Sequence, residues 1–408
     1  MRARVAVLIL TFLAVSTGAL ITPGSEALAD DITIGVLVDL SGPNGAIGRA
    51  QRNSYLMARD EINAAGGLAG GLLQLDLRDT GGRPATARSV TKHFIENKGY
   101  PLIVGGSGSP VAGEAARLCQ NLGIPYLVVS GAEDSITRRG YNYVFRLAHT
   151  FEMYQAGAVD FLKSVIDPRK VSLVHERSLF AERTMVTLRR AGRQLGWEVS
   201  VFPYDYGTDD FSSILARVGE AEPDVVTVIS FGRDAASIVA GLRGSGIAPE
   251  ALIGGSSAFS GREFYRAAGP SADGVLFVSV WSPKLPYPEA RTYFEEYRRR
   301  FGADPDYHGA QAYSAIYVVH RALALSPSRK AVDIRNALAG TAMRTAIGPV
   351  RFVSEHGYTN QSLPTVFLQQ WIDGVPEIVW PPDLRTAEPL TNTPGGLSGE
   401  MSPRRDLP

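Results

Sequence analysis

The residue types that could carry out chemistry in this sequence do not assemble into a catalytic or metal-binding motif. The six histidines lie far apart, and none has the paired spacing of a zinc site. The stretch Gly105-Gly106-Ser107-Gly108-Ser109 lacks the lysine of a P-loop and the glycine spacing of a dinucleotide-binding fingerprint. Ser109 also occupies the last glycine position of a Gly-x-Ser-x-Gly elbow. We therefore expect no enzyme activity, no metal site and no cofactor.

The same glycine-rich stretch has the features of a ligand-binding turn. It follows a short apolar run and precedes a helix that begins near Pro110, so it can present backbone N–H groups and serine hydroxyls to an anionic or polar group. The alternative is a tight strand-to-helix turn that binds nothing. The local pattern favours neither interpretation.

The elements around this turn alternate between short β-branched runs and amphipathic helical segments, which is typical of parallel βαβ units. One series of expected strands precedes the helix at about 151–165, and a second series follows it. Two such series predict an α/β protein of two doubly wound, parallel-sheet lobes. Ligands of such sheets bind outside the carboxyl ends of the strands, so we expect a ligand-binding cleft between the lobes.

The N-terminus has the pattern of a cleavable signal peptide. Arg2 and Arg4 precede an apolar run at 5–21, and Ala27-Leu28-Ala29 offers a small-x-small cleavage site. We interpret residues 1–29 as a signal peptide cleaved near Ala29 rather than as a membrane anchor. From residue 386 to 408 the chain is rich in Pro, Gly, Ser and Thr, and we expect a disordered tail.

Composition excludes several classes of partner. Lysine plus arginine equals aspartate plus glutamate at 41 each, and no long basic block occurs, so nucleic acid and anionic membranes are poor partners. The single cysteine, Cys119, cannot form an internal disulfide, so apolar cores must hold the fold. A chain of 408 residues exceeds what one core usually organises, which again predicts two domains.

Several short motifs, in order, resemble the periplasmic binding proteins of branched-chain amino acid ABC transporters, which have the type I periplasmic-binding fold. The resemblance covers nearly all of the chain after the signal peptide. It rests on Ile34-Gly35-Val36, Leu40-Ser41-Gly42-Pro43, Ala58-x-x-Glu61-Ile62-Asn63-Ala64-Ala65-Gly66-Gly67, Tyr143-x-Phe145-Arg146, Gly309-Ala310-Gln311-Ala312-Tyr313 and Gly348-Pro349-Val350-Arg351-Phe352.

The resemblance implies a topology and a mechanism. It implies three chain crossings at a hinge, with an N-terminal lobe of residues 31–148 and 280–352 and a C-terminal lobe of 149–279 and 353–385. The implied function is that of a monomeric periplasmic protein without a membrane anchor, which closes on a small molecule and delivers it to an ABC-transporter permease. The small molecule is expected to be an amino acid or a small organic acid or amide.

Ligand contacts of the family can be transferred to positions of this sequence. The serine that holds an amino acid's carboxylate falls on Ser109, and its partners from the next strand end fall near Ala132 and Asp134. The aromatic residues of the second lobe fall on Phe180 and Phe231. The acid that would pair with the ligand's ammonium is expected at a position occupied by Ser256.

These departures from the family pattern leave the ligand open. In one interpretation amino-acid specificity is retained and Glu133 or Asp134 binds the ammonium. In the other the ligand has changed to an aromatic or aliphatic carboxylate, an amide or a polyol, and Ser256 marks the change. A ligand-sensing protein of the same fold and a hydrolase on a related α/β scaffold are the competing functions.

Overall fold

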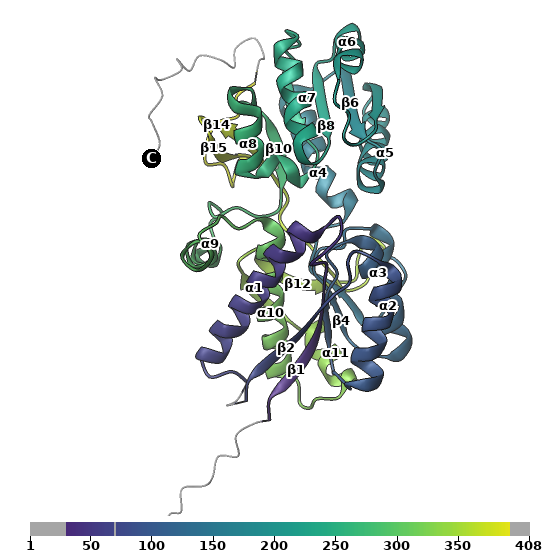
Figure 1. Cartoon of the computed structure of the whole chain (residues 1–408), viewed down its shortest axis with the longest axis vertical. Helices are drawn as coiled ribbons and strands as arrows, with labels where there is room; N and C mark the ends of the chain where they lie inside the picture. Colours follow the sequence, from purple (N-terminus) through teal and green to yellow (C-terminus); the bar gives the residue numbers. More distant parts are fainter. Residues whose placement is uncertain (1–29, 69–70, 392–408) are drawn as a thin grey trace, which may run out of the picture.

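The protein consists of two α/β lobes, each built around one largely parallel sheet (Figure 1). These two lobes confirm the expected fold class. The computed structural model describes residues 30–68 and 71–391. The expected signal peptide, residues 1–29, lies outside the described residues.

The sheet of the first lobe has eight strands in the order β11-β12-β13-β5-β4-β3-β1-β2. Strands β1 to β5 and β13 pair in parallel, whereas β11, β12 and β13 pair with each other antiparallel. The strands are β1 (Ile32–Val38), β2 (Leu73–Asp79), β3 (Ile103–Gly105), β4 (Tyr126–Val128), β5 (Val144–Arg146), β11 (Ala342–Thr345), β12 (Gly348–Val353) and β13 (Gln361–Ser362). The helices are α1 (Gly45–Ala64), α2 (Pro84–Lys92), α3 (Ser109–Leu122), α9 (Pro288–Phe301), α10 (Tyr307–Leu325) and α11 (Ala331–Ala339).

Different helices cover the two faces of this sheet. Because neighbouring residues of a strand point to opposite faces, one strand can contribute to both of the cores that result. On β1, Ile34 and Val36 belong to the apolar core that includes α1 and α10, whereas Leu37 belongs to the core that includes α3. Cys119 is fully buried in the second of these cores, and burial raises the pKa of its thiol. It packs as a small apolar residue.

The sheet of the second lobe has seven strands in the order β15-β14-β10-β9-β8-β6-β7. Helices α4 and α5 contribute to the core on one face, and α6, α7 and α8 contribute to the core on the other. The strands are β6 (Lys170–Glu176), β7 (Glu198–Tyr204), β8 (Val225–Ile229), β9 (Ala251–Gly254), β10 (Leu276–Ser279), β14 (Phe367–Ile372) and β15 (Val375–Trp380). The helices are α4 (Phe151–Phe161), α5 (Leu179–Gln194), α6 (Ser212–Glu220), α7 (Gly232–Gly244) and α8 (Arg262–Ala268).

The chain crosses between the lobes three times: between β5 and α4, between β10 and α9, and between β13 and β14. The last crossing lies further along the chain than expected. The family resemblance implies a crossing after residue 352. In the structure, however, Phe352 pairs with Ser362, and Gln361 pairs with Arg146, within the first sheet. The first lobe therefore extends to Ser362, because a two-residue strand closes the gap between β12 and β5.

The beginning of the expected disordered tail is ordered. Leu390 N donates to Gln370 Oε1 at 2.7 Å, and Gln370 Nε2 donates to the Leu390 carbonyl at 2.7 Å. Thr386 N also donates to the Ile378 carbonyl at 2.8 Å. The prediction of disorder was therefore wrong for residues 386–391, which bind to β14 and β15 through their backbone. Residues 392–408 lie outside the described part.

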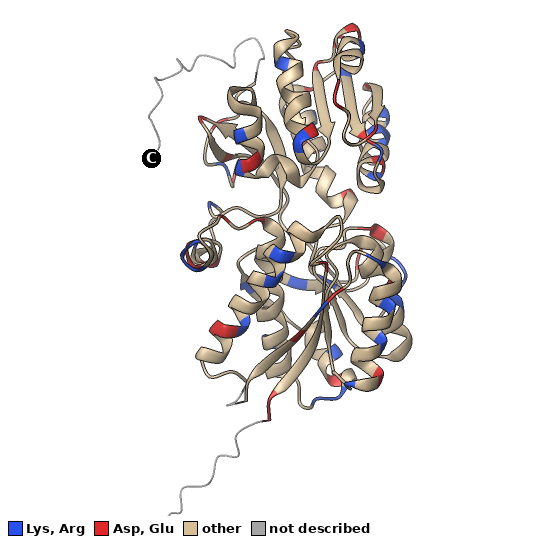
Figure 2. Ribbon diagram, in the orientation of Figure 1, with Lys and Arg blue, Asp and Glu red and all other residues tan. Residues whose placement is uncertain are grey.

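Charged residues of both signs are interspersed over the two lobes (Figure 2). Within residues 30–68 and 71–391, none of the helices has the length and apolar character needed to span a bilayer.

Candidate functional site

The glycine-rich turn after β3 places a serine at the start of α3. Gly105 and Gly106 have φ values of +120° and +88°, which favour glycine, and they reverse the chain so that α3 begins at Ser109. Ser109 Oγ accepts hydrogen bonds from Ala132 N and Glu133 N, each at 3.1 Å. Because both lone pairs of this oxygen are used, the hydroxyl is left with its O–H to donate to a ligand. Ser109 and Ala132, each predicted as a ligand contact from the family resemblance, thus lie side by side.

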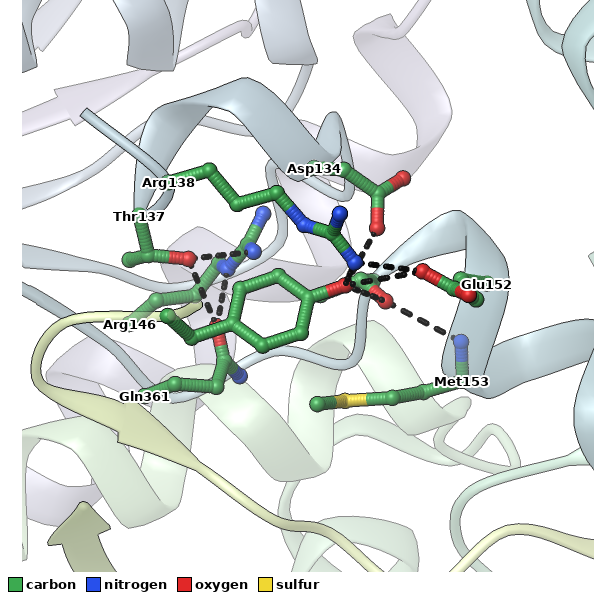
Figure 3. A network of polar contacts seen from close by, with 9 residues as sticks. Asp134, Thr137, Arg138, Arg146, Glu152, Met153 and Gln361 are labelled. Carbon is green, nitrogen blue, oxygen red and sulfur yellow. Dashed lines mark hydrogen bonds and ion pairs between the residues drawn. The ribbon is translucent and has the colours of Figure 1, made fainter. Parts of the chain in front are cut away.

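A buried arginine, Arg146, holds the loop that bonds to Ser109; Figure 3 shows its bonds to Thr137 and Gln361. Arg146 donates to the carbonyls of Gly131 at 3.3 Å and Glu133 at 2.7 Å, to Thr137 Oγ1 at 2.5 Å and to Gln361 Oε1 at 2.6 Å. Burial lowers the pKa of this guanidinium to about 10. All four partners are neutral acceptors, so Arg146 acts as a fixed positive centre directly behind the loop.

Asp134 belongs to a second network at the first crossing rather than standing open beside Ser109 (Figure 3). Its Oδ1 accepts from the Tyr358 hydroxyl at 2.7 Å. Arg138 lies over the Tyr358 ring at 4.4 Å from its centroid and also donates to Glu152 at 2.6 Å. The carboxylate expected beside the ligand is therefore already engaged in linking the first lobe to the start of α4.

Aromatic rings of the second lobe continue this site. Phe180, in the first turn of α5, and Phe231, which precedes α7, contact edge to face with ring centroids 5.2 Å apart. Phe151 contacts Phe180 in the same way at 5.5 Å, and Phe151 N donates to the Ala132 carbonyl at 3.0 Å. This series connects the two aromatic residues to the Ser109 loop, so the structure brings the expected contacts of both lobes to one region.

Ser256 differs from the other predicted site residues because its hydroxyl is fully used within the lobe. It is buried, donates to the Ser230 carbonyl at 2.5 Å and accepts from Ala258 N at 3.3 Å. These bonds link the ends of β8 and β9. The hydroxyl of Ser256 therefore has a structural role within the second lobe.

Buried aromatic and imidazole rings form the junction between the lobes. His149 stacks on Tyr154 at 4.7 Å and meets Tyr307 edge to face at 5.9 Å. Burial lowers the pKa of His149 to about 3, so the ring is neutral, and its Nδ1 has no hydrogen-bond partner in residues 30–68 and 71–391. Among the described residues, His149 Nδ1 is thus a buried polar atom of the junction without a hydrogen-bond partner.

Ion pairs between the lobes, among the residues that the structure describes, involve partly exposed side chains. Arg138 lies 2.6 Å from Glu152, Arg183 lies 3.9 Å from Glu133, and Arg262 lies 2.7 Å from Asp304. All six residues retain solvent contact, and such pairs contribute about 0–1 kcal/mol each. Charge contacts between these side chains therefore hold the lobes together only weakly.

Comparison with known proteins identifies the family. A model of the family described as periplasmic binding protein matches residues 31–374. The chain belongs to the periplasmic binding protein family. The resemblance found in the sequence motifs is thus confirmed.

Relatives of this periplasmic binding protein include Leu/Ile/Val-binding protein homolog 8 of Brucella melitensis biotype 1. It is 26% identical, and the alignment covers 89% of this chain and 94% of the relative. The leucine-specific-binding protein of Salmonella typhimurium is 23% identical over 80% of this chain and 88% of that protein. The shared length places both lobes within the aligned region.

Solved structures confirm the fold of the periplasmic binding protein. The substrate-binding protein LivJ of Streptococcus pneumoniae, in complex with isoleucine, has a TM-score of 0.75 at 24% identity and covers 86% of this chain and 100% of LivJ. A solute-binding protein of Rhodopseudomonas palustris BisB5, in complex with 3,4-dihydroxybenzoic acid, has a TM-score of 0.72 at 19% identity and covers 85% and 95%. These two proteins share one fold and bind ligands with and without an amine.

Predicting the ligand contacts from the family resemblance missed three residues of the periplasmic binding protein's candidate site. Arg146 was noted only as part of a motif, whereas Glu176 and His149 were not singled out. Glu176 is the last residue of β6 and is 4% exposed. An acid at the carboxyl end of a buried parallel strand is a signal that could have identified it.

A small pocket of about 270 Å³ lies beside the site within the first lobe. Its lining includes Ser109, Glu133, Arg117 and Arg139. No group of three or more His, Cys, Asp or Glu residues that could hold a metal ion occurs in the described residues.

Proposed function

We propose that this protein is the extracytoplasmic solute-binding component of an ABC importer, which closes on a small organic molecule and delivers it to a permease. The observation that carries the proposal is the Ser109 hydroxyl, which keeps one O–H donor and bonds to Ala132. Ala132 in turn bonds to Phe151, whose ring contacts Phe180 of the aromatic pair Phe180 and Phe231. The ligand carries a carboxylate, which accepts from Ser109, and an apolar part, which contacts the rings. Removal of the signal peptide near Ala29 leaves the protein in the periplasm.

The three crossings form the hinge. Gln361 ties two of them together, because its Oε1 accepts from Arg146 at 2.6 Å and its Nε2 donates to the Ala148 carbonyl at 2.8 Å. The connections therefore move as one unit while each lobe keeps its own sheet. Closure is favoured only by contacts that the ligand makes better in the closed state than in the open one. Because the ion pairs between the lobes are weak, the ligand's contacts determine whether the closed or the open state is favoured.

A thermal-shift screen of the purified exported protein tests the proposal. Binding to the folded state stabilises it by about 2.7 kcal/mol when the free ligand is at a hundredfold excess over Kd. We expect a raised melting temperature with at least one amino acid or one aromatic or aliphatic carboxylate. Amides and polyols that lack a carboxylate are the comparison set. A shift with polyols alone would contradict the role assigned to Ser109.

Replacing both Phe180 and Phe231 with alanine is expected to weaken binding of the compound found in the screen at least tenfold. The substitutions remove the apolar wall on one side of the ligand, and each lost aromatic contact is worth about 1 kcal/mol or more. Titration calorimetry measures the affinity. Val186→Ala, an exposed apolar position of the same α5, is the control and should leave it unchanged. An unchanged affinity in the double variant would exclude these rings from the site.

A further inference from the structure

The site lacks the acid that the family pattern expects to pair with a ligand's ammonium group. The acids considered above as substitutes are already engaged with other residues. Asp134 is bound to Tyr358. Glu133 has its side chain 3.9 Å from Arg183, which already supplies a positive charge. Ser256 carries no charge and its hydroxyl is used within the second lobe. A carboxylate that could bind a cationic ligand group must therefore come from another element.

Glu176 is such a carboxylate. It ends β6, is 4% exposed, and accepts one hydrogen bond at Oε2 from Phe231 N at 3.1 Å. In the part of the chain that the structure describes, its Oε1 accepts no hydrogen bond and no lysine or arginine forms an ion pair with the carboxylate. That oxygen is also absent from the polar atoms that are fully enclosed without a partner, so it faces accessible space.

A buried carboxylate without a cation is costly, because burial removes much of its hydration, and the single hydrogen bond from Phe231 N replaces only part of it. A cation arriving with a ligand offsets this cost. The aromatic residues strengthen the case, because Phe231 is held to the carboxylate by its own backbone N–H and its ring contacts Phe180. Aromatic faces attract cations, most of all where water is excluded. The carboxylate and the two rings together form a setting for one positive group.

We propose that Glu176 is the residue that selects ligands carrying an ammonium group, which it binds next to Phe180 and Phe231 while Ser109 binds the carboxylate. The inference rests on the proposed function and adds the charge that the ligand must carry. It places the charge partner at the end of β6, on the lobe opposite Ser109, so the two charged ends of one ligand bind to different lobes. Closing the cleft then brings both contacts together.

The test is titration calorimetry on the wild-type protein and Glu176→Gln with matched pairs of compounds. L-leucine is paired with 4-methylpentanoate, and L-phenylalanine with 3-phenylpropanoate, so each pair differs by the ammonium group alone. The wild-type protein is expected to prefer the amine-bearing member of at least one pair. Glu176→Gln should weaken binding of that member by about 10- to 100-fold, the range for one hydrogen bond to a charged group, and change binding of the amine-free acid less than about threefold.

Glutamine keeps the acceptor for Phe231 N and nearly the same volume, and Glu182→Gln, at an exposed position of α5, controls for the loss of one negative charge. Without ligand, Glu176→Gln should unfold in urea at the same or a higher midpoint than the wild type. A much lower midpoint would assign Glu176 to the fold alone and overturn the inference. An unchanged amine preference in Glu176→Gln, or a wild-type preference for the amine-free acids, would also overturn it. Failure of all four compounds and of the screen would overturn the proposed function itself.

Discussion

Replacing Arg146 with methionine is expected to lower the free energy of unfolding by about 3–5 kcal/mol and to abolish measurable ligand binding. Methionine keeps the apolar stem of the side chain but removes the donors to Gln361, Thr137 and the carbonyls of Gly131 and Glu133. Each buried acceptor left without a donor costs about 1–3 kcal/mol, and removal of the buried charge offsets part of the sum. Urea unfolding measures the stability, and calorimetry measures the binding.

The control for this prediction lies on the loop between β4 and β5, which Arg146 binds. Arg139→Met removes the same kind of side chain at an exposed position and should change stability by less than about 0.5 kcal/mol. If Arg146→Met lost less than 1 kcal/mol, the network in Figure 3 would be a weak determinant of the fold. Retained binding in a folded Arg146→Met protein would show that the Ser109 loop keeps its position without the arginine.

Gly105→Ala is expected to destabilise the protein by about 3–5 kcal/mol. A Cβ at this position would lie 2.1 Å from the Leu37 carbonyl oxygen, and the φ of +120° disfavours any side chain. Backbone strain of this kind costs about 1–3 kcal/mol, and overpacking costs a similar amount. Because β3 must move away from β1, the turn that carries Ser109 moves too, and affinity should fall with stability.

Gly113→Ala is the matched control, because it is a glycine of the helix that follows the same turn. Its Cβ would meet nothing within 4 Å, and alanine is preferred over glycine within a helix by about 0.5–1 kcal/mol. Urea unfolding should therefore give opposite signs for the two substitutions. Equal effects would mean that the close approach of Gly105 to β1 does not govern stability.

The sequence predicted the fold where its signals are local. The first helix of the second lobe begins at Phe151, as expected, and β6 (Lys170–Glu176) follows it as the first strand of the second series. The chain after Trp281 was harder to predict, because the pairs that attach its strands to the two sheets, β13 with β5 and β14 with β10, join segments far apart in the sequence. The two-residue β13 has no pattern of its own, so its place could not be predicted from the sequence.

The candidate site was predicted unevenly for a similar reason. Ser109, Ala132, Phe180 and Phe231 lie at turns whose position follows from the strand before them, and the structure brings these turns together. The hydrogen-bond partners of neighbouring side chains could not be predicted, because the partner of Asp134, for example, is Tyr358, 224 residues away. Arg146 and Glu176 are charged residues at the ends of strands, and only the packing of the strands shows which of their atoms have partners.

The discontinuous first lobe has a consequence for how the protein is synthesised. Helix α1 packs against α10, and Ser54 bonds to Tyr293, which follows 239 residues later. When the first five strands have been synthesised, the face of α1 that packs against α10 stays uncovered while the chain from Arg146 to the start of α10 at Tyr307 is translated. The second lobe, whose β6 to β10 are consecutive, can begin to assemble before that. The nascent chain thus carries an exposed apolar helix face for most of its translation, a period in which it depends on chaperones to avoid aggregation.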